Sequence, residues 1–372
     1  MADALLKKSL KHAPLVLGLT ALVSLAPAQA SIRGLASGFA SATGVSSDGN
    51  VVAYHSQPSL QYRSTRWTPS GTTDLGLLPG GQSAMTLGIS GDGRTIVGRG
   101  QTSTSFFAPY RWNAELGIQP MTLPSGVTGI DDASVSRDGS VIVATGYTSS
   151  GFGRAMRWTE ASGFVPLANL SASTFSSSTV GAISADGESA FGGSDGSIVR
   201  WNAAGAVQSM GRPQGTSGAS AVDASADGTF LAAMAFVGLN RRGYRVTSAG
   251  FEALPMLSGY SELVPSAISP DGRVIVGSLG QGNGPGFLWT AETGTLSLLS
   301  LLGSQGVDTS NWSGLSPNAV TIDAQGRIVV VGSGNAGDTA FRAVLAPVPE
   351  PASLIVLGLG VVAVARRRRA SR

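Results

Sequence analysis

The chain offers few residues for nucleophilic catalysis. It contains no Cys and only two His, so thiol nucleophiles, disulfides and Cys-ligated metals are excluded. A serine nucleophile would need a histidine base, and we expect no Gly-x-Ser-x-Gly nucleophile elbow. His12 lies in an N-terminal segment with the pattern of a cleaved leader, which leaves His55, just past an apolar run. A lone histidine there is typical of a polar loop residue, and we predict no catalytic residue.

Aspartate recurs in a pattern that could suggest metal binding. It is the third residue of Ser-x-Asp-Gly at six places: Asp48, Asp92, Asp138, Asp186, Asp227 and Asp271. A Ca²⁺ site needs several oxygen ligands that converge, whereas each of these aspartates stands alone in its motif. Asp131-Asp132 and Asp195 lack metal-loop spacing as well. Asp-Gly is instead a strong turn signal, so we predict structural turns, no metal and no cofactor.

Paired carboxylates could support glycoside hydrolysis if two acids converged at about 5 to 9.5 Å. The candidates are Glu115, Glu160, Glu188, Glu252 and Glu262. Their irregular places relative to the Ser-x-Asp-Gly motifs favour solvated loops. Because distances between distant segments are invisible in the sequence, a hydrolase remains the alternative function.

The basic residues are concentrated at the two ends of the chain. The 372 residues carry a formal net charge of +3, and 13% are charged, against about 25% in an ordinary domain. Removing residues 1–30 and everything from Ala352 onward takes away three lysines, five arginines and one aspartate, leaving 17 arginines and 21 acids. Because the body is acidic and lacks Lys, we expect no nucleic-acid partner.

The N-terminal segment has the pattern of a secretory signal peptide. Basic residues near the start precede an apolar run over residues 13–26 and Ala28-Gln29-Ala30. This order predicts export by the Sec machinery and cleavage between Ala30 and Ser31. An uncleaved N-terminal anchor is the alternative.

The C-terminal segment has three parts in a specific order. Pro349-Glu350-Pro351 precedes an apolar run over residues 352–365, and Arg366, Arg367, Arg368 and Arg369 follow. The run is short for a bilayer span, but the arginines would stay on the cytoplasmic side and stop transfer. A simple membrane tail is one interpretation.

The same three parts resemble the PEP-CTERM sorting signal of exported proteins in Gram-negative bacteria that make exopolysaccharide. The resemblance implies that Pro349, Glu350 and Pro351 are recognised by an exosortase, a membrane cysteine protease. It also implies an inner-membrane intermediate, with only transient membrane attachment, and then release to the cell surface or extracellular matrix.

The body between the two ends is a sevenfold repeat. The six Ser-x-Asp-Gly motifs recur about every 44 residues, and Asp323-Ala324-Gln325-Gly326 holds a degraded seventh place. After each turn comes a β-branched run, such as residues 274–277, then an aromatic strand such as Arg157-Trp158-Thr159, then a Gly turn and a Leu/Pro-rich strand such as residues 75–81. We expect no helix in the body.

Four short strands per 44 residues is typical of a propeller blade. The sequence therefore predicts an all-β fold, a seven-bladed β-propeller over residues 31–345, between a signal peptide (1–30) and a sorting segment (346–372). The seventh unit lacks a fourth strand, and residues 32–35 are predicted to supply it. A β-solenoid and an array of β-sandwiches are the competing architectures.

The tryptophan that recurs in the aromatic strands has two interpretations. Exposed rings could form a carbohydrate platform, but residues repeated at one place in every blade usually pack between blades. The arginine before each Trp would point to the opposite sheet face and could bond the next blade.

The repeat pattern over residues 40–345 also resembles the extracellular HAF-repeat family, although the eponymous His is missing from every unit. That family implies location but no activity. We therefore expect a non-catalytic surface or matrix protein that contacts exopolysaccharide or another protein.

Overall fold

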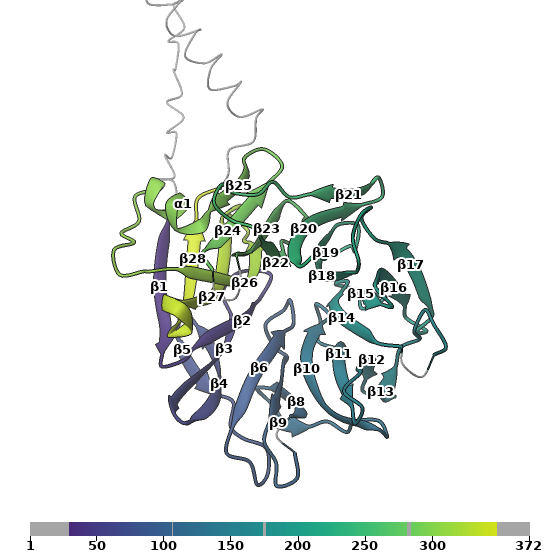
Figure 1. The fold of residues 1–372 in the computed structure, drawn as a ribbon. Helices are drawn as coiled ribbons and strands as arrows, with labels where there is room; N and C mark the ends of the chain where they lie inside the picture. The colour runs from purple at the N-terminus through teal and green to yellow at the C-terminus, as the bar shows by residue number, and fades with distance from the viewer. Residues whose placement is uncertain (1–29, 106, 174–175, 281–283, 348–372) are drawn as a thin grey trace, which may run out of the picture.

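The computed structural model describes residues 30–105, 107–173, 176–280 and 284–347. Seven four-stranded antiparallel sheets surround a central axis (Figure 1). The molecule is a seven-bladed β-propeller, as the repeat predicts. The predicted signal peptide up to Gln29 and the Pro-Glu-Pro and Arg residues from Val348 onward lie outside the described residues.

Six blades each use four consecutive strands, which follow one another from the channel outward. Blade 1 contains β2 (Ser41–Val45), β3 (Val52–Ser59), β4 (Gln61–Thr68) and β5 (Gly71–Asp74); blade 2 contains β6 (Ala84–Ile89), β7 (Ile96–Gly100), β8 (Ala108–Asn113) and β9 (Gly117–Pro120). Blade 3 contains β10 (Val127–Val135), β11 (Val141–Thr148), β12 (Gly153–Thr159) and β13 (Gly163–Pro166); blade 4 contains β14 (Ser178–Ile183), β15 (Ser189–Ser194), β16 (Ser197–Asn202) and β17 (Val207–Gly211). Blade 5 contains β18 (Ala219–Ala224), β19 (Leu231–Val237), β20 (Asn240–Thr247) and β21 (Gly250–Ala253); blade 6 contains β22 (Leu263–Ile268), β23 (Val274–Leu279), β24 (Gly286–Thr290) and β25 (Gly294–Ser297).

Blade 7 is closed by strands from both ends of the ring. It contains β26 (Leu315–Ile322), β27 (Ile328–Gly334), β28 (Thr339–Leu345) and, as its outermost strand, β1 (Ser31–Ser37), with a short 3-10 turn η1 (Asn335–Gly337) before β28. Ser31 pairs with Val344 and Ser37 with Thr339. The predicted closure by the N-terminal strand is confirmed.

The outer strands differ from the prediction. The Leu/Pro-rich segment at residues 75–81 lies outside the strands, and the fourth strand of blade 1 is β5, the four residues before it. The reason is local: Leu75 and Leu78 are buried and anchor the crossing to the next blade. The apolar pattern thus marks packing rather than a strand.

The alternation of strands gives the propeller two faces. Connections from first to second strand and from third to fourth share one face, which we call the turn face because it carries the Ser-x-Asp-Gly turns. The remaining connections lie on the opposite side, the loop face. Because Ser31 pairs with Val344 near the end of β28, β1 begins and β28 ends at the turn face.

Tryptophans fill the seams between neighbouring blades. Five of them occupy the same place in the third strand, are at most 7% exposed, and pack against the preceding blade: Trp67, Trp112, Trp158, Trp201 and Trp289. Trp201, for example, packs with Val143 and Leu167 of blade 3 and donates from Nε1 to the Ala168 carbonyl at 2.6 Å. The tryptophan row is therefore core and not a carbohydrate platform.

Blade 7 has Ala343 where five of the other blades have tryptophan, and a helix fills the space. Helix α1 (Leu298–Ser304) lies beside β24 and β25, and its Leu298 and Leu302 are buried in one cluster with Phe341 and Ala343 (Figure 1). The expectation of no helix in the body is wrong. The segment is too short to show helical periodicity, and burial of its two leucines stabilises it.

Candidate functional site

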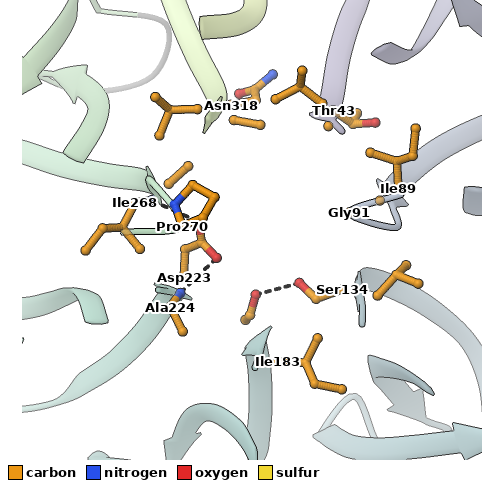
Figure 2. A pocket seen from close by; sticks show the side chains of 18 of the residues that line it. Thr43, Ile89, Gly91, Ser134, Ile183, Asp223, Ala224, Ile268, Pro270 and Asn318 are labelled. Carbon is orange, nitrogen blue, oxygen red and sulfur yellow. Dashed lines mark hydrogen bonds between the residues drawn. The ribbon is translucent and has the colours of Figure 1, made fainter. Parts of the chain in front are cut away.

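A polar cavity occupies the central channel of the propeller. It has a volume of about 290 Å³ and is lined by the innermost strands of all seven blades (Figure 2). Hydroxyl and amide groups of Thr43, Ser134, Ser266 and Asn318 line it, together with many apolar side chains. Such a channel accommodates water or a small polar group.

Two carboxylates from different blades line this channel. Asp132 of blade 3 and Asp223 of blade 5 each follow a bulge of the innermost strand, a feature that redirects side chains. In the sequence, Asp132 shows no metal spacing, and Asp223 was not among the predicted candidates. The available signal was a departure from the repeat, because Gly44, Gly88 and Ala267 stand where blade 5 has Asp223.

Enclosure by the ring changes how these carboxylates titrate. Burial raises the pKa of Asp223 to about 7, with a smaller contribution from the charge of Asp132. The Asp132 side chain is accessible to channel water, yet protein encloses it, and this desolvation raises its pKa to about 6, with Asp131 adding repulsion. The two groups hold protons more strongly than free aspartates do.

Hydrogen bonding limits what this pair can do. Asp223 Oδ1 accepts the Ala224 N–H at 2.8 Å and Oδ2 accepts the Ile268 N–H at 2.9 Å, so the carboxyl joins blades 5 and 6 (Figure 2). Asp132 Oδ1 accepts the Ala133 N–H at 2.8 Å. Asp223 therefore has a structural role, in which its carboxyl group links blades 5 and 6. No group of three or more His, Asp or Glu that could hold a metal occurs in the described residues.

The repeated aspartates lie in turns on the turn face. In blade 1, Ser46 donates its hydroxyl proton to Asp48 Oδ1, which also accepts the Asn50 N–H at 3.0 Å. The same serine-to-aspartate hydrogen bond recurs at Asp92, Asp138, Asp186, Asp227 and Asp271. Each carboxylate is thus used inside its own turn.

Backbone hydrogen bonds join these turns around the channel. Several residues beside the turn aspartates participate: Ser47 N–H donates to the Gly91 carbonyl, Arg137 N–H to Ala185 and Ala185 N–H to Ala226, at 2.7 to 2.9 Å. Ala226 N–H donates to Pro270, which has no N–H to continue the series. The turns therefore align neighbouring blades.

Arginines of the aromatic strands also bridge blades. Arg66, Arg157 and Arg245 each donate to the carbonyl of the turn glycine in the next blade, at 3.2 to 3.3 Å. Arg342 donates to the Gly49 carbonyl at 2.8 Å and so joins blade 7 to blade 1. This agrees with the predicted position of these side chains on the opposite sheet face.

Two other residues differ from their expected environments. His55 is in strand β3 rather than a loop and is 8% exposed; burial lowers its pKa to about 4, so it is neutral. Glu262 is 2% exposed, not solvated, and accepts from Arg241 at 2.9 Å, and this partner lowers its pKa. His55 directly follows the buried residues 51–54, and Glu262 directly precedes the buried Leu263 of β22.

Residues 192–196 fit Gly-x-Ser-x-Gly, so the expectation that the sequence lacks this pattern is wrong. The structure places it in the hairpin between β15 and β16 instead of a strand-to-helix turn. Ser194 is 1% exposed and its hydroxyl donates to Asp195. It lacks the exposed oxygen that a nucleophile needs.

Exposed apolar side chains gather on the loop face. Among the residues that the structure describes, most of the exposed large apolar side chains lie in its connections or at the adjoining strand ends: Phe39, Leu60, Phe107, Leu170, Phe236, Val237, Leu239 and Tyr260. Leu60 and Leu239 are at least 95% exposed, at the tips of hairpins in blades 1 and 5. These side chains come from connections around the whole ring, so the loop face presents more exposed apolar groups than the turn face does.

Comparison with known proteins identifies the C-terminal segment. Residues 347–369 match the PEP-CTERM protein-sorting motif. The motif indicates an exported protein that passes through a membrane-anchored intermediate and is processed by an exosortase. No helix long and apolar enough to cross a membrane occurs within the described residues.

Solved structures resemble the body in fold. The β-propeller domain of Cps50 (Swd1) from Myceliophteria thermophila is 13% identical, with a TM-score of 0.56, covering 85% of this chain and 100% of that one. An oligogalacturonate lyase in complex with manganese is 13% identical (TM-score 0.52; 82% and 88% covered), and the Vibrio parahaemolyticus oligogalacturonate lyase is 12% identical (TM-score 0.54; 83% and 89% covered). No curated protein matches the sequence. These likenesses show the propeller fold. They do not test the resemblance to the HAF-repeat family, which depends on the sequence pattern alone.

Proposed function

We propose that this protein is a non-catalytic surface or matrix protein that binds exopolysaccharide through the loop face of its propeller. The observation that carries the proposal is the placement of the exposed apolar side chains on the face opposite the ends of the ring. β28 ends at the turn face with Leu345, and three residues separate it from Pro349. A chain held by its C-terminal segment would therefore present the loop face away from its attachment point.

The composition of the loop face suits a sugar polymer better than a charged ligand. Connections such as residues 101–105 and 149–151 contain only Gln, Ser, Thr and Gly. Hydroxyl groups can exchange hydrogen bonds with sugars, while the aromatic rings of Phe39, Phe107 and Tyr260 offer flat apolar surfaces to the C–H faces of a pyranose. The alternative ligand for the same face is another protein.

Retention on immobilised exopolysaccharide from a producing strain tests this function. We expect the protein to be retained without release of shorter sugars, and a variant with Phe39→Ser, Phe107→Ser and Tyr260→Ser to lose most of that retention. A matched variant, Leu116→Ser, changes an exposed apolar residue in a turn-face connection and should be retained normally. Equal retention of both variants would contradict binding through the loop face.

The hydrolase alternative gains one observation from the channel. Asp132 and Asp223 are inward carboxylates from two blades with raised pKa values, a feature found at many catalytic sites. Asp223 is engaged by two backbone N–H groups, which favours a structural role. If the protein cleaved the same polysaccharide and Asp132→Asn abolished the cleavage, its function would be hydrolysis and not binding alone.

We further propose that both ends of the chain are removed. Cleavage after Ala30 would leave Ser31, the first residue of β1, as the N-terminus, and no part of the ring would be lost. The exosortase would act beyond β28, in the segment that contains Pro349, Glu350 and Pro351. Both cleavages would leave the closed blade 7 intact.

A further inference from the structure

Blade 5, like blade 7, has no tryptophan in its third strand. Val246 stands at that place and packs with Phe191 of blade 4, which supplies part of the missing volume. No helix fills this seam in the described part of the chain, and a groove of about 360 Å³ remains between blades 4 and 5. Phe191, Met210, Phe230 and Val246 form its apolar walls.

An arginine lines this groove in a position that faces a tryptophan ring in three other seams. Arg111 lies 4.8 Å from the ring centre of Trp158, Arg245 lies 5.7 Å from Trp289, and Arg342 lies 5.5 Å from Trp67. In each case the arginine of one blade covers the tryptophan of the next. Arg200 is the corresponding residue of blade 4, and it lines the groove with Val246 in place of a tryptophan while donating to Ser189 Oγ at 2.7 Å.

We propose that the seam between blades 4 and 5 binds an aromatic side chain of a partner protein, with tryptophan as the best fit. The charge complementarity is that of these three seams, a guanidinium over an electron-rich ring. The groove is open at the surface, where Met210 is exposed, so a side chain carried by another polypeptide can enter it. The proposed site contains no residue of the sorting segment and none of the exposed apolar residues of the loop face named above. Binding at this site therefore does not depend on polysaccharide binding.

Titration of the protein with indole and with N-acetyltryptophanamide tests the site by calorimetry. We expect saturable binding of both probes, because an open groove tolerates the peptide groups that flank a side chain. Arg200→Met should weaken binding between about twofold and thirtyfold, the range of a cation–π contact. Arg157→Met is the matched control, because Arg157 belongs to the seam that Trp201 already fills, and it should bind both probes normally.

A second pair of variants closes the groove in different ways. The double variant Phe191→Val and Val246→Trp recreates the Val143 and Trp201 pairing of the neighbouring seam and should abolish binding. Met210→Glu changes a wall residue that is 36% exposed, leaves the packing of Phe191 against Val246 as it is, and should also abolish binding. Binding of neither probe, binding of indole alone, or undiminished binding in these variants would overturn the proposal.

Discussion

At the residue scale, the clearest feature is a contrast between two classes of aspartate. The turn aspartates accept hydrogen bonds from serine hydroxyls and backbone N–H groups, and these bonds lower the pKa of Asp138 and Asp227. Asp132 and Asp223 in the channel have raised pKa values because the surrounding protein partly desolvates them. One residue type therefore stabilises the fold in its charged form at the turns and in its neutral form in the channel.

Asp132→Asn should reveal this contrast in the pH dependence of stability. The folded-state pKa of about 6 exceeds the ordinary value of 3.8, so ionisation costs folding free energy as pH rises from about 4 through 6. The variant should match the wild type near pH 4 and be more stable above pH 6. We expect a gain of about 1 kcal/mol or less, because channel water screens the charge.

Asp138→Asn provides a control of opposite sign for the same series of melting curves. Hydrogen bonds lower the pKa of Asp138, so its contribution to stability is present above the ordinary pKa and lost as pH falls through the folded pKa. This variant should be less stable than the wild type at pH 7, and the difference should shrink in acid. If both substitutions shifted stability at pH 7 in the same direction, the assignment of opposite pKa shifts to Asp132 and Asp138 would be contradicted.

At the element scale, the seams determine how blades pack. Tryptophan fills five seams, helix α1 fills the one before blade 7, and Phe191 fills part of the one before blade 5. What fills each seam depends on the residue at the tryptophan position of the third strand. Where this residue is Ala343, α1 fills the seam with Leu298 and Leu302. Small irregular elements therefore compensate for single-residue departures from the repeat.

Leu302→Ala should destabilise the propeller by about 2 to 5 kcal/mol, the usual cost of such a cavity. Leu302 is fully buried against blade 7. Leu301→Ala on the same helix is the control and should cost less, because Leu301 is only partly buried. Chemical denaturation measures both, and equal effects would mean that α1 does not fill the seam.

Much of the element order could be predicted from the sequence because the repeat is regular. The Ser-x-Asp-Gly turns, the β-branched second strands and the Arg-Trp strands each have a local signature. The outer strands and α1 could not be predicted, since their residues are chosen by packing between blades. Asp223 was missed for a similar reason: only the closed ring brings it to the channel, and a single acid within an apolar strand gives no spacing pattern.

At the scale of the whole molecule, the ring is closed by two strands far apart in the sequence. β1 pairs with β28, and Arg342 and Thr321 of blade 7 both bond blade 1. Closed rings leave no end blade unpaired, so damage at the closure should affect every blade.

Deleting residues 31–40 should therefore destabilise the whole ring. We expect a lower thermal midpoint and faster hydrogen exchange in all blades, including blade 4 on the far side. Leu60→Ser, at an exposed hairpin tip, is the control and should behave as the wild type does. Faster exchange confined to blades 7 and 1 would show that the ring is held by its seams without the closure.

We propose that processing at both ends delivers an intact propeller to the outside of the cell. Intact-mass measurement of the protein recovered from the cell surface or medium tests it most directly, with a variant carrying alanines at Pro349, Glu350 and Pro351 as the comparison. We predict a species that begins at Ser31 and lacks Arg366 to Arg372, whereas the alanine variant stays in the inner membrane. An extracellular species that retains those arginines would contradict the account.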